Sequence, residues 1–156
     1  MDTVLEYIRR ELRYRLDLTD DEVLLESAAV LSDRSDTRGA VISLVNFKVS
    51  AYQGQGLGRP DLLDSLELLL LFSFRFRRYD DSLRYLYRTL RLFDEKPAYT
   101  ANDSHPENPF PAHVEKLFFT QLPVELDSLG GLWGMLGGTL YPSALYTLRM
   151  VRPKQR

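Results

Sequence analysis

The sequence predicts an α+β domain, in which a mostly antiparallel sheet of about five strands carries three packed helices. Two periodicities lead to this class. Apolar residues alternate along Leu66–Phe76, as on a strand, and recur at helical spacing from Leu126 to Leu136. The 156 residues contain no internal repeat and no linker, so we expect one domain over residues 1–156 that buries its own core.

Composition narrows the function classes. The formal net charge of -2 provides no overall attraction to nucleic acid or to an anionic membrane. The absence of cysteine excludes disulfides, thiolate metal sites and cysteine nucleophiles. Arg9, Arg10 and Arg13 interrupt the first apolar stretch, and Leu68–Phe72 is too short to span a bilayer. We therefore expect no signal peptide, no membrane partner, and synthesis and assembly in the cytoplasm.

The first predicted helix begins at a capping box formed by Thr3 and Glu6 and runs to about Leu16. Its opposite face carries arginines, which either bind phosphate or form a solvated surface. We favour the solvated surface, because acidic residues balance the arginines across the chain. The apolar positions recur at helical spacing: Val4, Leu5, Ile8, Leu12 and Leu16.

Two strands are predicted next, Val23–Leu31 and Ala40–Tyr52, paired as an antiparallel hairpin around a polar loop. The following loop, Gln53–Pro60, has alternating glycines. It lacks the lysine of a phosphate-binding loop, so we interpret it as a flexible loop that orders against a partner.

Ser65–Phe76 is the clearest strand, with its even-numbered apolar residues on one face. A second helix follows, in which Asp80 or Asp81 caps or complements the N-terminus. Their side chains diverge on a helix, which disfavours an acid–base pair. Pro97 ends this helix. Its predicted buried stripe consists of Leu83, Leu86, Tyr87, Leu90 and Phe93.

The remaining chain begins with a long irregular loop, Ala98–Ala112. A strand over Val114–Leu122 and a third helix from Pro123 to about Leu136 come next. A glycine stop and a Tyr-Pro corner precede the last strand, Ala144–Val151, which we expect to close the fold. The predicted aromatic anchors of the core are Phe72, Phe74, Phe93, Phe119 and Trp133.

The chain lacks a constellation typical of catalysis. It has two histidines, His105 and His113, without carboxylates at metal-ligand spacing, and it has neither a nucleophile elbow nor a dinucleotide-binding glycine motif. We therefore expect a structural or binding protein with no enzymatic activity, no metal and no cofactor. A small hydrolase with an unrecognised site is an alternative, for which Ser143 and His113 are the residues to substitute.

A nucleic-acid-binding module is the second alternative. In the run from Phe74 to Tyr79, aromatic residues flank Arg75, Arg77 and Arg78, a pattern that can hold single strands by stacking. Strand alternation offers a simpler interpretation, which we favour: the phenylalanines face the core and Arg75 and Arg77 face the other way.

The C-terminal string from Leu132 to Met150 carries a resemblance. Trp133-Gly134-Met135-Leu136-Gly137 is followed by Tyr141-Pro142-Ser143-Ala144-Leu145-Tyr146 and then by Arg149-Met150. A strand ending in Leu-Val-Asn at Asn46 and a strand–helix unit over Leu66–Phe93 precede it in the same order. Together these segments resemble the cap, or tail-terminator, proteins of phage-tail-like contractile injection systems. The chain departs from that pattern at Phe47-Lys48-Val49, where acidic residues are usual, and at Thr147, where lysine is common.

The resemblance implies a structural protein that binds the distal end of a contractile tail as a six-fold ring. Such a ring stops polymerisation of the inner tube and the sheath and holds them together, within a particle that is released or cell-anchored. The implied partners are further copies of the chain, the sheath protein and the tube protein. The residues that carry the signature, which we interpret mainly as turn and core residues, are Trp133, Gly137, Tyr141, Pro142, Ser143, Tyr146 and Arg149.

We predict partner binding in three segments that look flexible and poorly packed: Gln53–Pro60, Thr100–Pro111 and Arg152–Arg156. The predicted contact residues are Gln53, Gln55, Leu57, Arg59, Asn102, His105, Asn108, Phe110, Arg152, Lys154 and Arg156.

Overall fold

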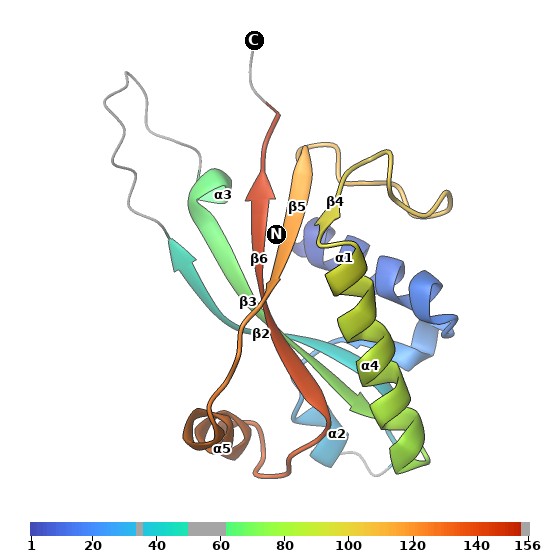
Figure 1. Ribbon diagram of the computed structural model, residues 1–156, viewed down its shortest axis with the longest axis vertical. Helices are drawn as coiled ribbons and strands as arrows, with labels where there is room; N and C mark the ends of the chain where they lie inside the picture. Colours follow the sequence, from blue (N-terminus) through green and yellow to red (C-terminus); the bar gives the residue numbers. More distant parts are fainter. Residues whose placement is uncertain (34–35, 50–61, 154–156) are drawn as a thin grey trace.

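The computed structural model describes residues 1–33, 36–49 and 62–153, and within these residues the chain forms one twisted six-stranded sheet (Figure 1). The strand order is β1-β2-β3-β6-β5-β4, and every pair except β1–β2 is antiparallel. The predicted α+β class is therefore confirmed. The strands are β1 (Val23–Leu25), β2 (Gly39–Val49), β3 (Leu66–Arg75), β4 (Ala98–Tyr99), β5 (Lys116–Gln121) and β6 (Ser143–Val151).

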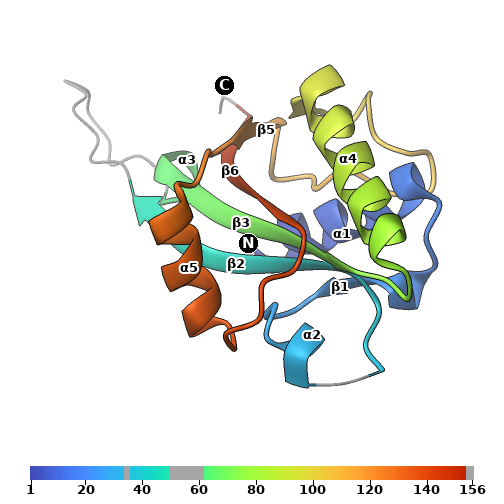
Figure 2. The same ribbon diagram turned by 60° about the horizontal axis from the view of Figure 1, so that its bottom comes forward.

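The longer helices lie on both faces of the sheet (Figure 2). Helices α1 (Asp2–Leu16) and α4 (Tyr79–Glu95) cover one face, and α5 (Leu126–Met135) packs on the other. The shorter helices are η1 (Asp20–Glu22), α2 (Val30–Asp33) and α3 (Leu62–Ser65).

The alternation along β3 builds the main core. Its even-numbered residues from Leu66 to Phe74 are buried against α1 and α4, because successive side chains of a strand point to opposite faces. Leu71 points to the other face and packs with Trp133 and Ala28. The five predicted aromatic anchors are all buried, so that prediction is confirmed.

The predicted hairpin of the first two strands is wrong. The chain leaves the sheet after Leu25, and the segment that follows forms a turn and α2, whose Val30 and Leu31 pack on Val41. Because this detour returns the chain to the same end of the sheet, β1 and β2 run parallel. Gly39 begins β2 with φ 137°, and a Cβ there would lie 2.2 Å from the Glu22 carbonyl oxygen, so glycine is required.

Two predicted caps are wrong. The N-cap of α1 is Met1, and Glu6 instead binds Arg9 and Arg10. Pro123 lies before α5, whose N-cap is Glu125.

The predicted solvated arginine face of α1 is only partly right, because Arg10 is exposed whereas Arg9 is covered. Arg9 is 12% exposed, because its guanidinium donates to Glu6, to Asp20 and to the Val23 carbonyl.

The prediction that Asp80 or Asp81 caps or complements the N-terminus of α4 is confirmed in its second form. The N-cap is Arg78, and Asp80 and Asp81 lie in the first turn, where negative charge complements the helix dipole.

The predicted buried stripe of α4 is only partly right. Phe93 is buried, but Leu83 is 43% and Tyr87 60% exposed. The buried residues of α4 are Ser82, Thr89 and Phe93, so the helix is rotated from the predicted orientation. Ser82 Oγ on this side accepts the Phe76 N–H at 2.8 Å.

Candidate interaction surfaces

No group of three or more His, Asp or Glu side chains among the described residues is placed to hold a metal ion. None of their helices is both long and apolar enough to cross a membrane. The sequence predicts partner binding, so the candidate site consists of surfaces that could bind other proteins.

The predicted docking loop Thr100–Pro111 is held against α1 by a buried carboxylate. Glu11 is 4% exposed and accepts hydrogen bonds from Asn108 Nδ2 at 2.9 Å and from Arg15 Nε at 3.0 Å. Asn108 is 1% exposed and also donates to the Tyr7 carbonyl at 3.0 Å. The expectation that this loop is poorly packed is wrong, and Asn108 is not at the surface.

Further contacts tie the same loop down. His105 stacks on Tyr14 with ring centroids 4.0 Å apart, and Phe110 contacts Tyr7 edge-to-face at 5.0 Å. The Lys96 ammonium donates to the Asp103 carbonyl at 2.6 Å. Both His105 and Phe110 are half-buried and Asn102 is exposed, so partner binding by these three residues stays a prediction.

The other predicted contact residues lie near or beyond the limits of the described chain. Arg152 is half-buried just after β6. The remaining six fall outside the described residues: Gln53, Gln55, Leu57, Arg59, Lys154 and Arg156.

The signature residues form the corner between α5 and β6. The Tyr141 hydroxyl donates to the Leu31 carbonyl at 3.2 Å, and its ring meets Trp133 edge-to-face with centroids 5.8 Å apart. The Arg75 guanidinium lies 5.6 Å from the Tyr141 ring centroid and donates to the same Leu31 carbonyl. The Pro142 carbonyl accepts the Phe74 N–H at 2.9 Å. These contacts fix the corner onto α2 and β3.

The rest of the signature is only partly buried. Gly137 has φ 110°, which an L side chain rarely adopts, so the turn after α5 needs glycine. Tyr146 is 3% exposed, and burial raises its pKa to about 12. Ser143 is the half-buried first residue of β6, whereas Arg149 is exposed. The signature therefore reports mainly on the fold.

The phenylalanines of the aromatic–arginine run face inward, as expected. Phe74 is buried and Phe76 stacks on Tyr85 at 4.4 Å. Arg78 pairs with Asp80 at 2.7 Å, whereas Arg77 and Tyr79 are exposed. Further along α4, Arg84 and Arg91 pair with acidic residues within one turn of the helix. Nucleic-acid binding by this run stays a prediction.

A surface that the sequence did not predict lies at the edge of β2. Strand β1 pairs with β2 only as far as Ile42, and the Ser43 hydroxyl donates to the Glu26 carbonyl at 2.6 Å where β1 ends. From Ser43 to Val49, β2 has β3 on one side and no described strand on the other. Three apolar side chains are exposed along this edge: Leu44 at 38%, Phe47 at 57% and Val49 at 51%. We call these three residues the β2 strip.

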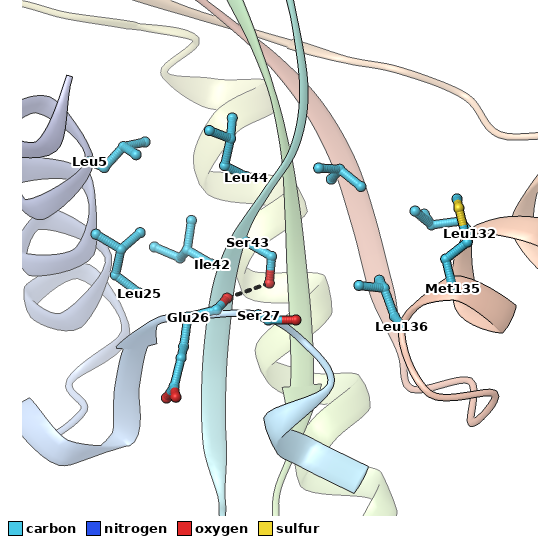
Figure 3. Close-up of a pocket in the computed structure, with 11 residues that line it drawn as sticks. Leu5, Leu25, Glu26, Ser27, Ile42, Ser43, Leu44, Leu132, Met135 and Leu136 are labelled. Atoms are coloured by element: carbon cyan, nitrogen blue, oxygen red, sulfur yellow. Dashed lines mark hydrogen bonds between the residues drawn. The ribbon is translucent and has the colours of Figure 1, made fainter. Parts of the chain in front are cut away.

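The β2 strip adjoins a groove of about 430 Å³ between α1 and α5 (Figure 3). Leu5 and Leu25 line it on one side, and Leu132, Met135 and Leu136 line it on the other, with β2 between them. A second groove of about 410 Å³ flanks α5 and shares Val45, Leu132 and Met135 with the first. Apolar surface thus lies on both sides of the open edge.

The β2 strip escaped prediction because a full strand over Val23–Leu31 would have covered it. The signal was nevertheless present: Ser27, Ala28 and Ala29 have low strand propensity and indicate an early end to β1.

Solved structures of other proteins share the fold of this chain. The PVC sheath/tube terminator, from an extracellular contractile injection system in its extended state, gives a TM-score of 0.64 at 14% identity, over 99% of this chain and 57% of that chain. The tube-terminating cap of the anti-feeding prophage gives a TM-score of 0.58 at 10% identity, over 97% of this chain and 54% of that chain. This chain therefore shares their fold and spans little more than half of each.

The family model of the Pvc16 N-terminal domain matches residues 3–156. The chain belongs to the Pvc16 N-terminal domain family. No protein of curated function matches the sequence. The resemblance inferred from the C-terminal string is confirmed at the level of the family and the fold.

Proposed function

We propose that this chain is a cap of a contractile injection-system tail, which binds the distal end as a ring and ends polymerisation of the inner tube and the sheath. The observation that supports this best is the family match over residues 3–156, nearly the whole chain. Two proteins that share the fold are a sheath/tube terminator and a tube-terminating cap.

The proposed partners are further copies of the chain, the sheath protein and the tube protein. A ring requires a heterologous interface that closes, so two different surfaces of each subunit meet its neighbours. Binding alone performs this function, so it requires neither a catalytic site nor a cofactor. The chain would be made and assembled in the cytoplasm and become part of an extracellular particle.

The test combines solution mass with tail binding. Light scattering of the purified protein, followed by negative-stain imaging, is expected to show rings of about six subunits, alone or on tail ends. Tube and sheath subunits that polymerise with the protein are expected to form tails capped at one end. Tails that lengthen equally with and without the protein, and that carry no density at either end, would contradict the proposal.

A further inference from the structure

We propose that the β2 strip and the adjoining groove bind an extended segment of a tail protein other than this chain, which adds to the sheet as a strand beside β2. The segment takes up the position where β1 stops. This inference rests on the proposed cap function for the identity of the partner, and it names the site and the mode of binding.

The backbone of β2 is the first argument. The Ile42 carbonyl accepts the Glu26 N–H at 3.1 Å, so it faces the β1 side. Backbone groups alternate in direction along a strand, and the bulge between Leu44 and Asn46 shifts the register by one residue. The N–H and C=O groups of Leu44, Phe47 and Val49 therefore point away from β3. An extended peptide can pair with such a row.

A local hydrogen bond supports this direction. The Phe47 N–H donates to the Asn46 side-chain oxygen at 2.9 Å, which shows that this N–H is not used by β3. The asparagine oxygen takes the place that the carbonyl of an added strand would fill.

The side chains are the second argument. Leu44, Phe47 and Val49 pair with Leu70, Leu68 and Leu66, respectively, so the strip lies on the α1 face of the sheet. On the opposite face, Val45, Leu132 and Met135 line the grooves beside α5, and Met135 is 81% exposed. An added strand would place alternate side chains on these two apolar surfaces. The partner segment is therefore expected to be apolar on the α1 face. On the other face it is expected to be apolar beside Val45 and polar beside Asn46 and Lys48, which are exposed.

The charge of the groove says more about the partner segment. Among the described residues that line the groove beside α1, Glu26 alone is charged, and it is exposed at the end of β1. A basic residue at that end of the partner segment would meet it.

A second copy of this chain fits the edge poorly. On the far side of the sheet, β4 pairs with β5 at Leu117 and Phe118, and the Phe119 N–H donates to the Pro97 carbonyl. The described residues therefore offer no second open edge of similar length. Pairing of β2 with β2 of another copy would be isologous and would close as a dimer, which does not build a ring. One foreign strand per subunit is compatible with a ring.

Charge insertion provides the first test, with matched controls. The double variant Leu44→Lys and Phe47→Lys places charge on side chains that are 38% and 57% exposed. The control, Leu83→Lys and Tyr87→Lys on α4, alters side chains that are 43% and 60% exposed. Both variants are first checked for unchanged thermal unfolding. In co-sedimentation with uncapped tails, we expect the affinity of the strip variant to be at least about tenfold lower than that of wild type. The cost of burying one unpaired charge exceeds the roughly 1.4 kcal/mol that corresponds to a tenfold change in affinity. The control is expected to bind like wild type.

Amide hydrogen exchange provides the second test, and it does not depend on a variant. In wild-type protein bound to tail ends, the Leu44 and Val49 amides are expected to exchange at least about tenfold more slowly than in free protein, because they gain strand partners. Docking by side chains alone would leave them unchanged.

The outcomes separate the two proposals. If wild type caps tails while the strip variant binds equally well and these amides stay unprotected, the strand-addition proposal is wrong and the cap function stands. Protection of the same amides in a free homodimer would identify a second copy as the occupant and overturn the proposal. If wild type does not bind tail ends, both proposals fail.

Discussion

The face of the sheet under α1 and α4 holds a connected aromatic cluster, whereas the face under α5 holds one buried tryptophan. On the first face Phe93 stacks on Phe119 at 4.3 Å and meets Tyr146 edge-to-face at 4.9 Å. On the second, Trp133 packs with Leu71 and Ala28, and the two grooves remain beside the helix. The difference suggests that the aromatic cluster mainly stabilises the domain. The surface around the open edge of β2 remains accessible to a partner, with the β2 strip on the α1 face and the grooves beside α5.

Removal of the central ring of the aromatic cluster is expected to cause the largest loss of stability, and it tests the difference between the two faces most directly. Phe93→Ala is expected to lower the free energy of unfolding by about 4 kcal/mol, because contacts with four other rings are lost and a cavity remains. Urea unfolding followed by circular dichroism measures the change. A loss smaller than that of Trp133→Ala would contradict the assignment of stability to this face.

Trp133→Ala tests the other face. We expect the free energy of unfolding to fall by about 3 kcal/mol, which is at the low end for a buried aromatic residue. The expected loss is small because α5 borders open grooves and can move to fill part of the cavity. The matched control is Leu126→Ala on the same helix, where an 82% exposed side chain should cost almost nothing. Because the variant lacks the chain's one tryptophan, its unfolding is followed by far-ultraviolet circular dichroism rather than by fluorescence. A parent-like midpoint would refute the structural role of Trp133.

The loop pinned to α1 sharpens the comparison. Asn108→Ala is expected to cost about 2 kcal/mol, because Glu11 and the Tyr7 carbonyl each lose a buried hydrogen bond. Amides of the loop should also exchange faster with solvent. Asn102→Ala, at an exposed position of the same loop, should change neither quantity. Equal effects of the two variants would show that the buried bonds do not hold the loop.

The glycines of the α5 region separate backbone strain from helix propensity. Gly137→Ala is expected to cost about 1–2 kcal/mol, because φ is 110° there. Gly134→Ala is expected to stabilise by up to about 1 kcal/mol, since a Cβ at this helical position meets nothing within 4 Å. Thermal unfolding of both variants gives the sign. A stabilising Gly137→Ala would show that the turn does not need its glycine.

The smallest expected effect concerns pH and the pinned loop. The Thr100 hydroxyl, followed by the Lys96 charge, lowers the pKa of Asp103 below its ordinary value of 3.8. Because the pKa of Asp103 is lower in the folded loop, the ionised carboxylate stabilises that loop at a pH above the ordinary pKa. This stabilisation is lost as the pH falls through the pKa of the folded state. Loop exchange, corrected for intrinsic rates, should be constant from pH 7 to about 5 and rise below about 4. Asp103→Asn should remove that rise. If the rise is unchanged in this variant, protonation of Asp103 is not its cause.

Strong periodicity made most of the fold predictable. The alternation along β3 and the helical spacing of α1 identified the elements and their buried faces, since each pattern has one period over many residues. The rotation of α4 was not predictable in the same way, because Leu83 and Tyr87 offer a second apolar stripe. A single tertiary hydrogen bond, from the Phe76 N–H to Ser82, accompanies the rotation that the structure adopts.

The candidate surface was harder to foresee. The β2 strip depends on where β1 ends, and that depends on the turn and on the packing of α2, which involve residues far apart in the sequence. The loop Thr100–Pro111 has the composition of a mobile segment, but one buried carboxylate from α1 organises it. Composition reports local preference, and neither feature is local.

The Asn46 side chain gives the open edge a form of self-protection. An uncovered strand edge is a template for aggregation, and natural proteins mask such edges. Because the Asn46 oxygen already accepts the Phe47 N–H, an incoming chain must first displace it and gains no additional hydrogen bond at that amide. A polar peptide strand would therefore bind this edge weakly. Only a segment that also buries apolar side chains would bind with a favourable free energy.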